Sequence, residues 1–167
     1  MTDSDLVAAG RAIIDRITYI TLATIDSQGR PWASPVFYAT ADYRDFYWIS
    51  APTTTHSRNI AECAQVSIVV FDSTVAPGTG QAVYAMADAA RLVVDADVSR
   101  ALTVYPGPPS RGARPMGIAE LEPPSPYRLY RATVTEQSMM CPRDSGPCEP
   151  HGIAHDHRTP VRLWDQL

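Results

Sequence analysis

A chain of 167 residues, 45% of them apolar, is long enough to fold as one domain around its own core. Its formal net charge of -4 at neutral pH gives no basic field that could hold a phosphate backbone, so nucleic-acid binding is disfavoured. The N-terminal sequence lacks the basic and apolar parts of a secretory leader, and no apolar run approaches the roughly 20 residues of a membrane helix, so a soluble cytoplasmic protein is expected.

The N-terminal part of the chain predicts a helix followed by an antiparallel meander. Residues 4–17 place their apolar side chains near one helical face, which predicts an amphipathic helix. β-Branched and aromatic residues in 19–25 and 31–40 flank an Asp-Ser-Gln-Gly turn, which predicts a β-hairpin. Residues 45–50 alternate in the same way and predict a third strand that continues the meander.

Short helices and strands are expected in the middle of the chain. Threonines 53–55 suit the N-cap of a short helix, and residues 65–72 then predict an apolar strand. Residues 81–94 are rich in alanine, yet their valines and tyrosine favour a long strand over a helix. Residues 95–105 predict another short helix.

The last third of the chain begins with a proline-rich segment. Seven prolines fall between Pro106 and Pro126, so this segment is expected to be irregular, and it could form a mobile lid. Alternation in residues 127–138 predicts a strand, and a last short strand is expected near 160–164. This order of elements predicts a mainly β fold with short helices, built as a six- to seven-stranded antiparallel barrel that is closed or half-closed.

Four segments carry a family resemblance: the hairpin ITLATIDSQGRPWASPVFY, the stretch WISAPTTTHSRNI, and the later strands RLYRATVTE and DHRTPVRL. They resemble the FMN-binding split β-barrels of the pyridoxamine 5'-phosphate oxidase-like family, whose hairpin reads Thr-x-x-x-x-Gly-x-Pro-x-x-x-Pro-Val. The second stretch is similar to the strand and helix start that hold the flavin phosphate in that family. The resemblance implies a split-barrel flavin-binding domain over 1–140, with 141–167 as the C-terminal loop and last strand of the same domain.

The resemblance also implies a homodimer with two flavin mononucleotide (FMN) sites at the subunit interface, each built from both chains. Main-chain groups of the second and third strands would line the flavin ring. The start of the following helix would surround the phosphate, and a glutamine from the next strand would reach the flavin. Carried over to this sequence, the cofactor-binding positions are Ser34, Pro35, Val36, Phe37, Ile49, Ser50, Thr54, Thr55, His56, Ser57 and Gln81.

Two of these positions differ from the family pattern. The family's phosphate lysine falls on His56, and the arginine often present on the second strand falls on Ser34. All fourteen basic residues of the chain are arginines, so no lysine is available as a substitute. A histidine is only partly charged at neutral pH unless the phosphate raises its pKa, which predicts weaker cofactor retention as the pH rises.

The phosphate assignment also has a physical reason that is independent of the family. Thr54, Thr55 and Ser57 place hydroxyls at a predicted helix start, where free N–H groups and the helix dipole favour an anion. Arg58 adds a positive charge nearby. The alternative is an ordinary N-cap followed by a polar loop, and without the resemblance that alternative is preferred.

A C-terminal run holds five side chains that can ligate zinc or iron, namely Cys141, Cys148, His151, His155 and His157. The six residues between the two cysteines exceed the two to four of zinc ribbons, and the prolines and glycines of this run indicate a flexible loop. A plain loop is therefore favoured over a structural metal or a reversible disulfide, and no metal site is assigned.

Aromatic side chains could stack on a flavin or a planar substrate, or pack in the core. Trp48 lies on a predicted central strand and is expected in the core. For Trp32 and Trp164, both stacking on a ligand and packing in the core remain possible roles. No catalytic residue is assigned. If a protein acid or base acts, Ser34, Tyr38 and Arg131 are the candidates.

The function implied by the resemblance is an FMN-dependent oxidoreductase acting on an unknown small molecule, in which the flavin carries the hydride. Pyridoxamine 5'-phosphate itself is not the expected substrate, because its phosphate would need its own cluster of Arg and Lys. One alternative is a deazaflavin (F420)-dependent reductase. The other is a non-catalytic flavin- or haem-binding protein, with His56 or a histidine of the C-terminal loop as the axial ligand.

Overall fold

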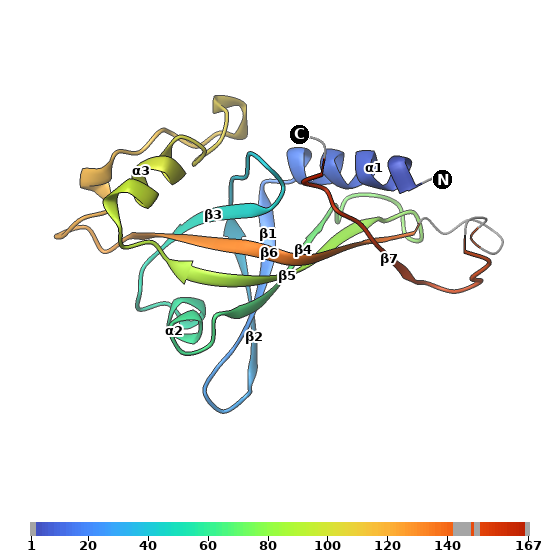
Figure 1. The fold of residues 1–167 in the computed structure, drawn as a ribbon, viewed down its shortest axis with the longest axis horizontal. Helices are drawn as coiled ribbons and strands as arrows, with labels where there is room; N and C mark the ends of the chain where they lie inside the picture. Colours follow the sequence, from blue (N-terminus) through green and yellow to red (C-terminus); the bar gives the residue numbers. More distant parts are fainter. Residues whose placement is uncertain (1–2, 142–147, 149–150, 166–167) are drawn as a thin grey trace.

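Strands make up most of the regular structure (Figure 1). The computed structural model describes residues 3–141, 148 and 151–165. In chain order the elements are α1 (Asp3–Arg16), β1 (Tyr19–Ile25), β2 (Pro31–Phe37), β3 (Asp45–Ser50), α2 (Thr55–Glu62), β4 (Gln65–Phe71), β5 (Ala82–Arg91), α3 (Asp95–Leu102), the 3-10 helices η1 (Pro109–Arg111) and η2 (Ile118–Glu120), β6 (Arg128–Met140) and β7 (Arg158–Pro160).

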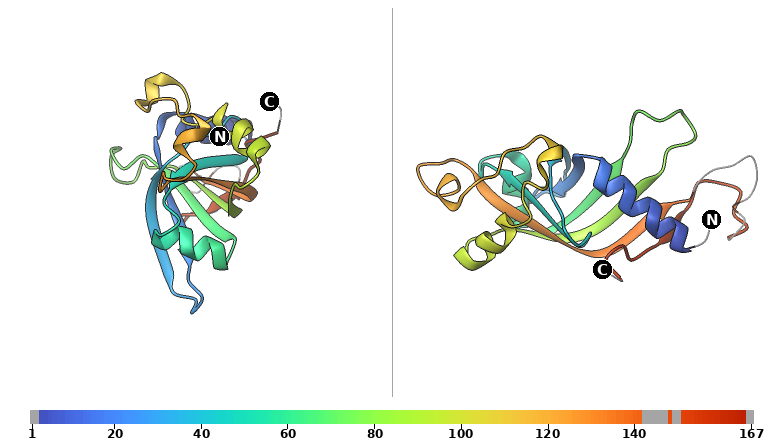
Figure 2. Two further views of the ribbon diagram at one scale, coloured as in Figure 1. Left: turned by 90° about the vertical axis from the view of Figure 1, so that its left-hand side faces the viewer. Right: turned by 90° about the horizontal axis from the view of Figure 1, so that it is seen from above.

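All strand pairings are antiparallel, and the sheet has the order β2-β1-β4-β5-β6-β3, with β7 paired to β6. The sheet curves strongly, and the β1–β2 hairpin extends beyond it (Figures 1 and 2). Its two edges meet where Ala39, just after β2, exchanges backbone hydrogen bonds of 3.0 and 2.9 Å with Tyr47 of β3. The predicted mainly β, antiparallel barrel is confirmed, with seven strands.

The predicted meander is wrong at β3, which pairs with β6 and not with β2. Trp48 lies opposite Tyr130, and the two rings stack with their centroids 5.7 Å apart. Before β3, the Asp42 carboxylate accepts hydrogen bonds from the backbone N–H groups of Arg44 and Asp45, at 2.9 and 2.8 Å, which turns the chain. The partner of β3 comes much later in the sequence, so local alternation could not identify it.

Alternation along β1 and β2 separates an inner face of the sheet from an outer face. Ile20 and Leu22 are buried on the inner face, where Val36 lies opposite Ile20. Tyr19 and Ile25 point to the outer face and are exposed. Buried side chains from α1 and from β3 to β6 complete the core on the inner face. The two faces therefore offer different surfaces, and the cofactor residues predicted on β2 are divided between them.

The predicted N-terminal helix is confirmed as α1, and it holds the C-terminal segment. The Arg11 guanidinium donates to the Leu163 carbonyl at 2.8 and 2.6 Å and to the Asp165 carbonyl at 2.7 Å. A side chain at Gly10 would begin only 2.9 Å from a methyl group of Leu163, so glycine permits this close approach. The two ends of the described chain thus stabilise each other.

The last strand lies earlier than the sequence predicts, at β7 and not at 160–164. Val161 and Leu163 are buried, yet their N–H groups donate to the backbone and side-chain oxygens of Gln137, at 2.9 and 3.2 Å, outside the strand pairing. Their apolar alternation reflects burial against the core. Alternating burial alone does not distinguish such a segment from a strand.

The predicted elements in the middle of the chain are confirmed as α2, β4, β5 and α3. The proline-rich segment has no regular structure beyond η1 and η2. Arg111 fastens it to the barrel by donating to the carbonyls of Tyr38 and Ile17, at 2.9 and 3.2 Å. A lid role for this segment stays a prediction. Within the described residues, no helix is long and apolar enough to cross a membrane.

Candidate functional site

Hydroxyl groups from three parts of the chain surround the buried imidazole of His56. Its Nε2 atom lies 2.7 Å from the Ser50 hydroxyl and 3.2 Å from that of Thr54, and its Nδ1 atom lies 3.2 Å from the hydroxyl of Ser34. The Thr54 hydroxyl also lies 2.8 Å from that of Ser57. These five residues, here called the hydroxyl cluster, join β2 and β3 to the start of α2. All five belong to the predicted cofactor set.

Strand register and one buried hydrogen bond position the hydroxyl cluster. Ser34 lies opposite Leu22 and therefore on the inner face, toward α2. Asn59 of α2 donates through its side-chain amide to the Thr24 hydroxyl of β1 at 2.9 Å, and both side chains are buried. This pair was not predicted from the sequence. The signal for it was the position of Asn59 three residues after His56, one helical turn away on the buried side of α2.

The protonation state of His56 follows from its burial. Burial lowers the pKa of this imidazole below its ordinary value of 6.5, so the neutral ring is favoured at neutral pH. A histidine whose pKa is lowered by folding contributes stability above its unfolded pKa, and this stability is lost as the pH falls through the folded pKa. A negative charge placed beside the ring would raise the pKa again.

The start of α2 leaves its first N–H groups without a side-chain cap. Thr54 occupies the N-cap position, but its hydroxyl makes no capping bond and donates instead to the Ala51 carbonyl at 3.0 Å. No acidic residue lies in the first turn. The expected alternative of an ordinary threonine N-cap is therefore not formed. Uncapped N–H groups beside several hydroxyls can bind an anion such as a phosphate.

Arg58 is the only cation in the first turn of α2, every residue of which is described. Its side chain is exposed, and its guanidinium donates to the carbonyl of Thr53. The arginine can therefore add positive potential near the helix start, whereas the buried hydrogen bonds of the site come from His56 and the hydroxyls.

The remaining predicted cofactor residues on β2 and β3 lie apart from the hydroxyl cluster. Val36 is buried in the core, and the Phe37 ring packs edge-on against two tyrosines. Ile49 packs against a second apolar cluster on the other side of β3 from Ser50. Pro35 is exposed on the outer face. Their predicted roles use main-chain groups, so these roles stay predictions.

Thr55 and Gln81 complete the predicted set. Thr55 is the first residue of α2 and is half-buried beside the hydroxyl cluster. Gln81 directly precedes β5, and its Nε2 atom is buried with no hydrogen-bond partner within the described part of the chain. A buried amide donor without an acceptor is costly unless water or a ligand satisfies it. Gln81 thus fits the role of a cofactor-binding donor.

Trp32 is the aromatic side chain nearest to the hydroxyl cluster. Its indole N–H donates to the Ser34 hydroxyl at 2.9 Å, and the side chain is 49% exposed. Core packing is therefore excluded for Trp32, while the predicted core position of Trp48 is confirmed. A large exposed ring fixed to the cluster by a hydrogen bond can stack on a planar ligand. The alternation of Trp32 with Ser34 along β2 was the signal for this role.

Tyr38 does not fit the role of acid or base. Its hydroxyl is buried and donates to the Ile14 carbonyl at 2.7 Å. Burial raises the pKa of Tyr38 to about 12, so the phenol stays protonated and engaged near neutral pH. Of the sequence candidates, Ser34 alone belongs to the hydroxyl cluster.

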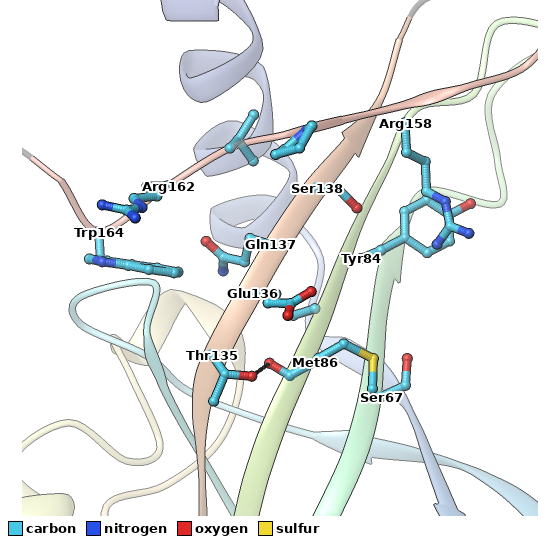
Figure 3. Close-up of a pocket in the computed structure, with 13 residues that line it drawn as sticks. Ser67, Tyr84, Met86, Thr135, Glu136, Gln137, Ser138, Arg158, Arg162 and Trp164 are labelled. Carbon is cyan, nitrogen blue, oxygen red and sulfur yellow. Dashed lines mark hydrogen bonds between the residues drawn. The ribbon is translucent and has the colours of Figure 1, made fainter.

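A separate cleft of about 550 Å³ lies on the outer face, between β4, β5, β6 and the C-terminal segment (Figure 3). The Arg158 guanidinium lies over the ring of Tyr84, 4.6 Å from its centroid, and Met86 and Glu136 line the floor. None of the predicted cofactor residues lines this cleft. This cleft could not be predicted from the sequence, because its residues come from four segments that meet only in the folded sheet.

The C-terminal cysteines and histidines come closer together than a plain loop requires. Cys141, Cys148, His151 and His157 place their ligand atoms within 4.8 Å of one another. His155 does not join them, and its side chain is exposed. These residues lie apart from the hydroxyl cluster, near the end of β6.

Residues 6–141 match the family model described as pyridoxamine 5'-phosphate oxidase. This match spans most of the chain and includes the hydroxyl cluster. A search among curated proteins finds no match.

Several solved structures share the fold. A haem-binding protein from Mycobacterium smegmatis superposes with a TM-score of 0.66 at 17% identity, covering 98% of this chain and 60% of that one. A FAD-binding protein from Mesorhizobium loti gives 0.60 at 16% identity, covering 79% and 91%. An F420 reductase gives 0.53 at 18% identity, covering 77% and 95%. The chain spans less than two thirds of the haem-binding structure, and identities this low show the fold alone.

Proposed function

The chain belongs to the pyridoxamine 5'-phosphate oxidase family, and from that premise we propose that it is a homodimeric, FMN-dependent oxidoreductase acting on a small molecule. The single observation that carries this proposal is the uncapped start of α2 beside His56 and its hydroxyl partners. The proposal includes a cytoplasmic location, in keeping with three cysteines that are all free thiols.

The donor set of the hydroxyl cluster fits the phosphate of FMN. Ser50, Thr54 and Ser57 offer hydroxyls, the first turn of α2 offers N–H groups, and His56 can take up a proton when a dianion binds. This set uses hydrogen bonds in place of the family's lysine. Charge-assisted hydrogen bonds of this kind are roughly twice as strong as neutral ones, so the phosphate should supply much of the binding energy.

Three features support a place for the flavin ring close to this phosphate site. Trp32 offers an exposed ring face, the main chain of 34–37 would run along the ring edge, and Ser34 joins both to His56. Gln81 precedes β5 at the end of that strand away from α2, so its amide would reach a flavin only from the second chain of the proposed dimer. Bound FMN would supply hydride transfer. The residues of this chain would bind the cofactor, orient its ring and exclude water.

The outer face of the sheet supports the proposed homodimer. Tyr19, Ile25, Phe71 and Met86 are between 41% and 58% exposed, and they lie on the adjacent strands β1, β4 and β5. Several large apolar side chains exposed on one face of adjacent strands are typical of an interface. A second copy of the chain is the occupant that the family predicts, and each cofactor site would then lie between two chains.

Two other cofactors remain alternatives within this family. The hypothesis of a deazaflavin cofactor rests on the fold shared with an F420 reductase. The hypothesis of a haem cofactor rests on the fold shared with a haem-binding protein. Both nitrogens of His56 already have hydroxyl partners, so ligation of haem iron by His56 would break at least one hydrogen bond. FMN needs no such change.

Reconstitution followed by absorption spectroscopy tests the proposed cofactor. The dimer, incubated with FMN, F420 or haem in parallel and then desalted, is expected to retain one FMN per chain. The double variant Thr54→Val, Ser57→Ala should release FMN on desalting, because it lacks two phosphate donors while His56 remains. A retained Soret band, or retained F420 with no retained FMN, would replace the proposal by the corresponding alternative.

A further inference from the structure

We propose that Cys141, Cys148, His151 and His157 form a structural zinc site that fastens the C-terminal strand to the barrel. One nitrogen or sulfur atom from each side chain lies within 4.8 Å of the other three. The proposal does not depend on the flavin site, because none of these residues belongs to the hydroxyl cluster.

The spacing of the ligand atoms matches a tetrahedral centre. The Nδ1 atom of His151 lies 3.4 Å from the Cys148 sulfur, 3.6 Å from the Cys141 sulfur and 3.2 Å from Nε2 of His157. Zinc bonds of about 2.05 Å to nitrogen and about 2.3 Å to sulfur give tetrahedral edges of roughly 3.3 to 3.8 Å. The three separations agree with these edges within about 0.2 Å. The other separations among the four atoms are at most 4.8 Å, so side-chain rotation would bring all four atoms around one ion.

Neighbouring groups orient the ligand rings as in known metal centres. Nδ1 of His157 lies 3.0 Å from the His155 carbonyl, to which it can only donate, so its Nε2 lone pair is directed to the cluster. The Thr159 hydroxyl lies 3.1 Å from the Cys141 sulfur and 3.5 Å from Nε2 of His151. Hydrogen-bond partners of this kind set the orientation of a ligating histidine ring and decide which of its two nitrogens binds the metal.

Strand pairing brings the first and last ligands together. Cys141 directly follows β6, and His157 directly precedes β7. The Cys141 N–H donates to the His157 carbonyl at 3.1 Å, which continues the register in which Met140 lies opposite Arg158. The separation of these two ligands is therefore set by the sheet.

A tight turn brings the middle two ligands together. The Cys148 N–H donates to the Ile153 carbonyl at 2.9 Å, and the N–H groups of His151 and Gly152 donate to the Cys148 carbonyl, at 3.1 and 2.7 Å. Gly152 has a φ of +66°, a conformation that L side chains rarely adopt. The backbone is thus shaped to present both side chains on one side of the turn.

The ligand types indicate zinc in a structural role. Two cysteines and two histidines form a common tetrahedral zinc set. The spacing His-x5-His lies within its usual range, whereas more residues than usual separate the two cysteines, which the fold brings together. Four protein ligands leave no open position for a substrate, which distinguishes structural from catalytic zinc. Cys141 is buried and His151 is exposed, so the ion would lie at the edge of the core with access from solvent.

The ion would stabilise a strand that is otherwise weakly held. β7 has three residues, and the buried Val161 and Leu163 follow it directly. Cys141 and His157 are far enough apart in the sequence that closing the loop between them costs entropy. A zinc ion that joins its two ends and its middle would hold β7 on β6, and through Leu163 would support the contact with α1.

Metal analysis of the reduced, desalted protein tests the site. The wild-type protein, loaded with zinc, is expected to retain one zinc per chain, and cobalt in its place should give the intense visible bands of a tetrahedral thiolate complex. His151→Ala and Cys148→Ser should weaken zinc binding by about 100-fold or more. The matched control His155→Ala removes an exposed histidine of the same segment and should keep the ion. These variants leave the buried Cys141 in place, so the core is not disturbed.

Three results would overturn the proposal: a wild-type protein that keeps no zinc, equal zinc retention in Cys148→Ser, or, in protein that is freed of metal before any reduction and then unfolded, a single reactive thiol per chain, which would indicate a Cys141–Cys148 disulfide. Hydrogen exchange tests the fastening role. Removing zinc with a chelator should speed exchange at the Val161 N–H, which donates to Gln137, while exchange in the β1–β2 hairpin stays unchanged. Unchanged exchange at Val161 would show that the ion does not hold β7.

Discussion

FMN should bind the wild-type protein about tenfold more weakly at pH 8.5 than at pH 7, and the His56→Gln variant should lose this dependence. Burial lowers the pKa of His56 in the free protein, and the phosphate dianion would raise it in the complex. Binding would then take up a proton between the two pKa values. Affinity therefore falls as the pH rises from the pKa of the free protein to that of the complex, and levels off above it.

The pH range isolates the histidine. The second proton of a phosphate monoester leaves at about pH 6. The cofactor itself is therefore almost fully dianionic above pH 7. His56→Gln keeps a hydrogen-bonding side chain but no charge, and it should bind FMN at pH 7 about as weakly as the wild type does at pH 8.5. His56→Lys should show little pH dependence over the same range, because a lysine stays charged there. Flat wild-type affinity from pH 7 to 8.5, measured by quenching of flavin fluorescence, would remove His56 from the phosphate site.

Trp48→Ala is expected to lower the free energy of unfolding by about 3 to 5 kcal/mol. The side chain is fully buried and stacks on Tyr130 with an interplanar angle of 14°. Its removal would leave a cavity where β3 pairs with β6, the pairing that holds β3 in the sheet. Chemical denaturation followed by circular dichroism, at one fixed protein concentration because a dimer is proposed, measures the loss.

Two control variants make the stability prediction specific. Trp48→Phe should cost less than Trp48→Ala, because it keeps an aromatic ring and removes an indole N–H that has no partner among the described residues. Trp32→Ala should change the free energy of unfolding by about 0.5 kcal/mol or less, since that side chain is half exposed. An equal loss of stability for Trp32→Ala and Trp48→Ala would contradict the assignment of one tryptophan to the core and the other to the site.

Local patterns in the sequence predicted the helices and strands well, because each pattern reports on neighbouring residues. The β1–β2 hairpin appears where alternation placed it. The strand over 81–94, which its alanines could have made a helix, appears where its valines and tyrosine favoured one. The pairing of β3 with β6 could not be predicted in this way. Strands of similar alternation can pair in several orders, and here a buried aromatic stack between distant residues selects one.

The candidate site was only partly visible in the sequence. The threonines, His56 and Ser57 stand side by side in the chain, so their grouping at a helix start could be predicted. Ser34 joins them only because β2 folds over the start of α2, and the resemblance alone suggested it. The sequence favoured a plain loop over a metal site, because six residues separate Cys141 from Cys148. The pairing of β6 with β7, which brings Cys141 close to His157, could not be seen in that spacing.

A comparison of FMN with riboflavin tests the central claim most directly, since the two differ only in the phosphate that the start of α2 is proposed to hold. Titration at pH 7, followed by flavin fluorescence, should give saturable binding of one FMN per chain. Riboflavin should bind at least about 100-fold more weakly, the loss expected for two or more hydrogen bonds to a charged group. Equal affinity for the two flavins, or no binding of either, would contradict the claim that this helix start is a flavin phosphate site.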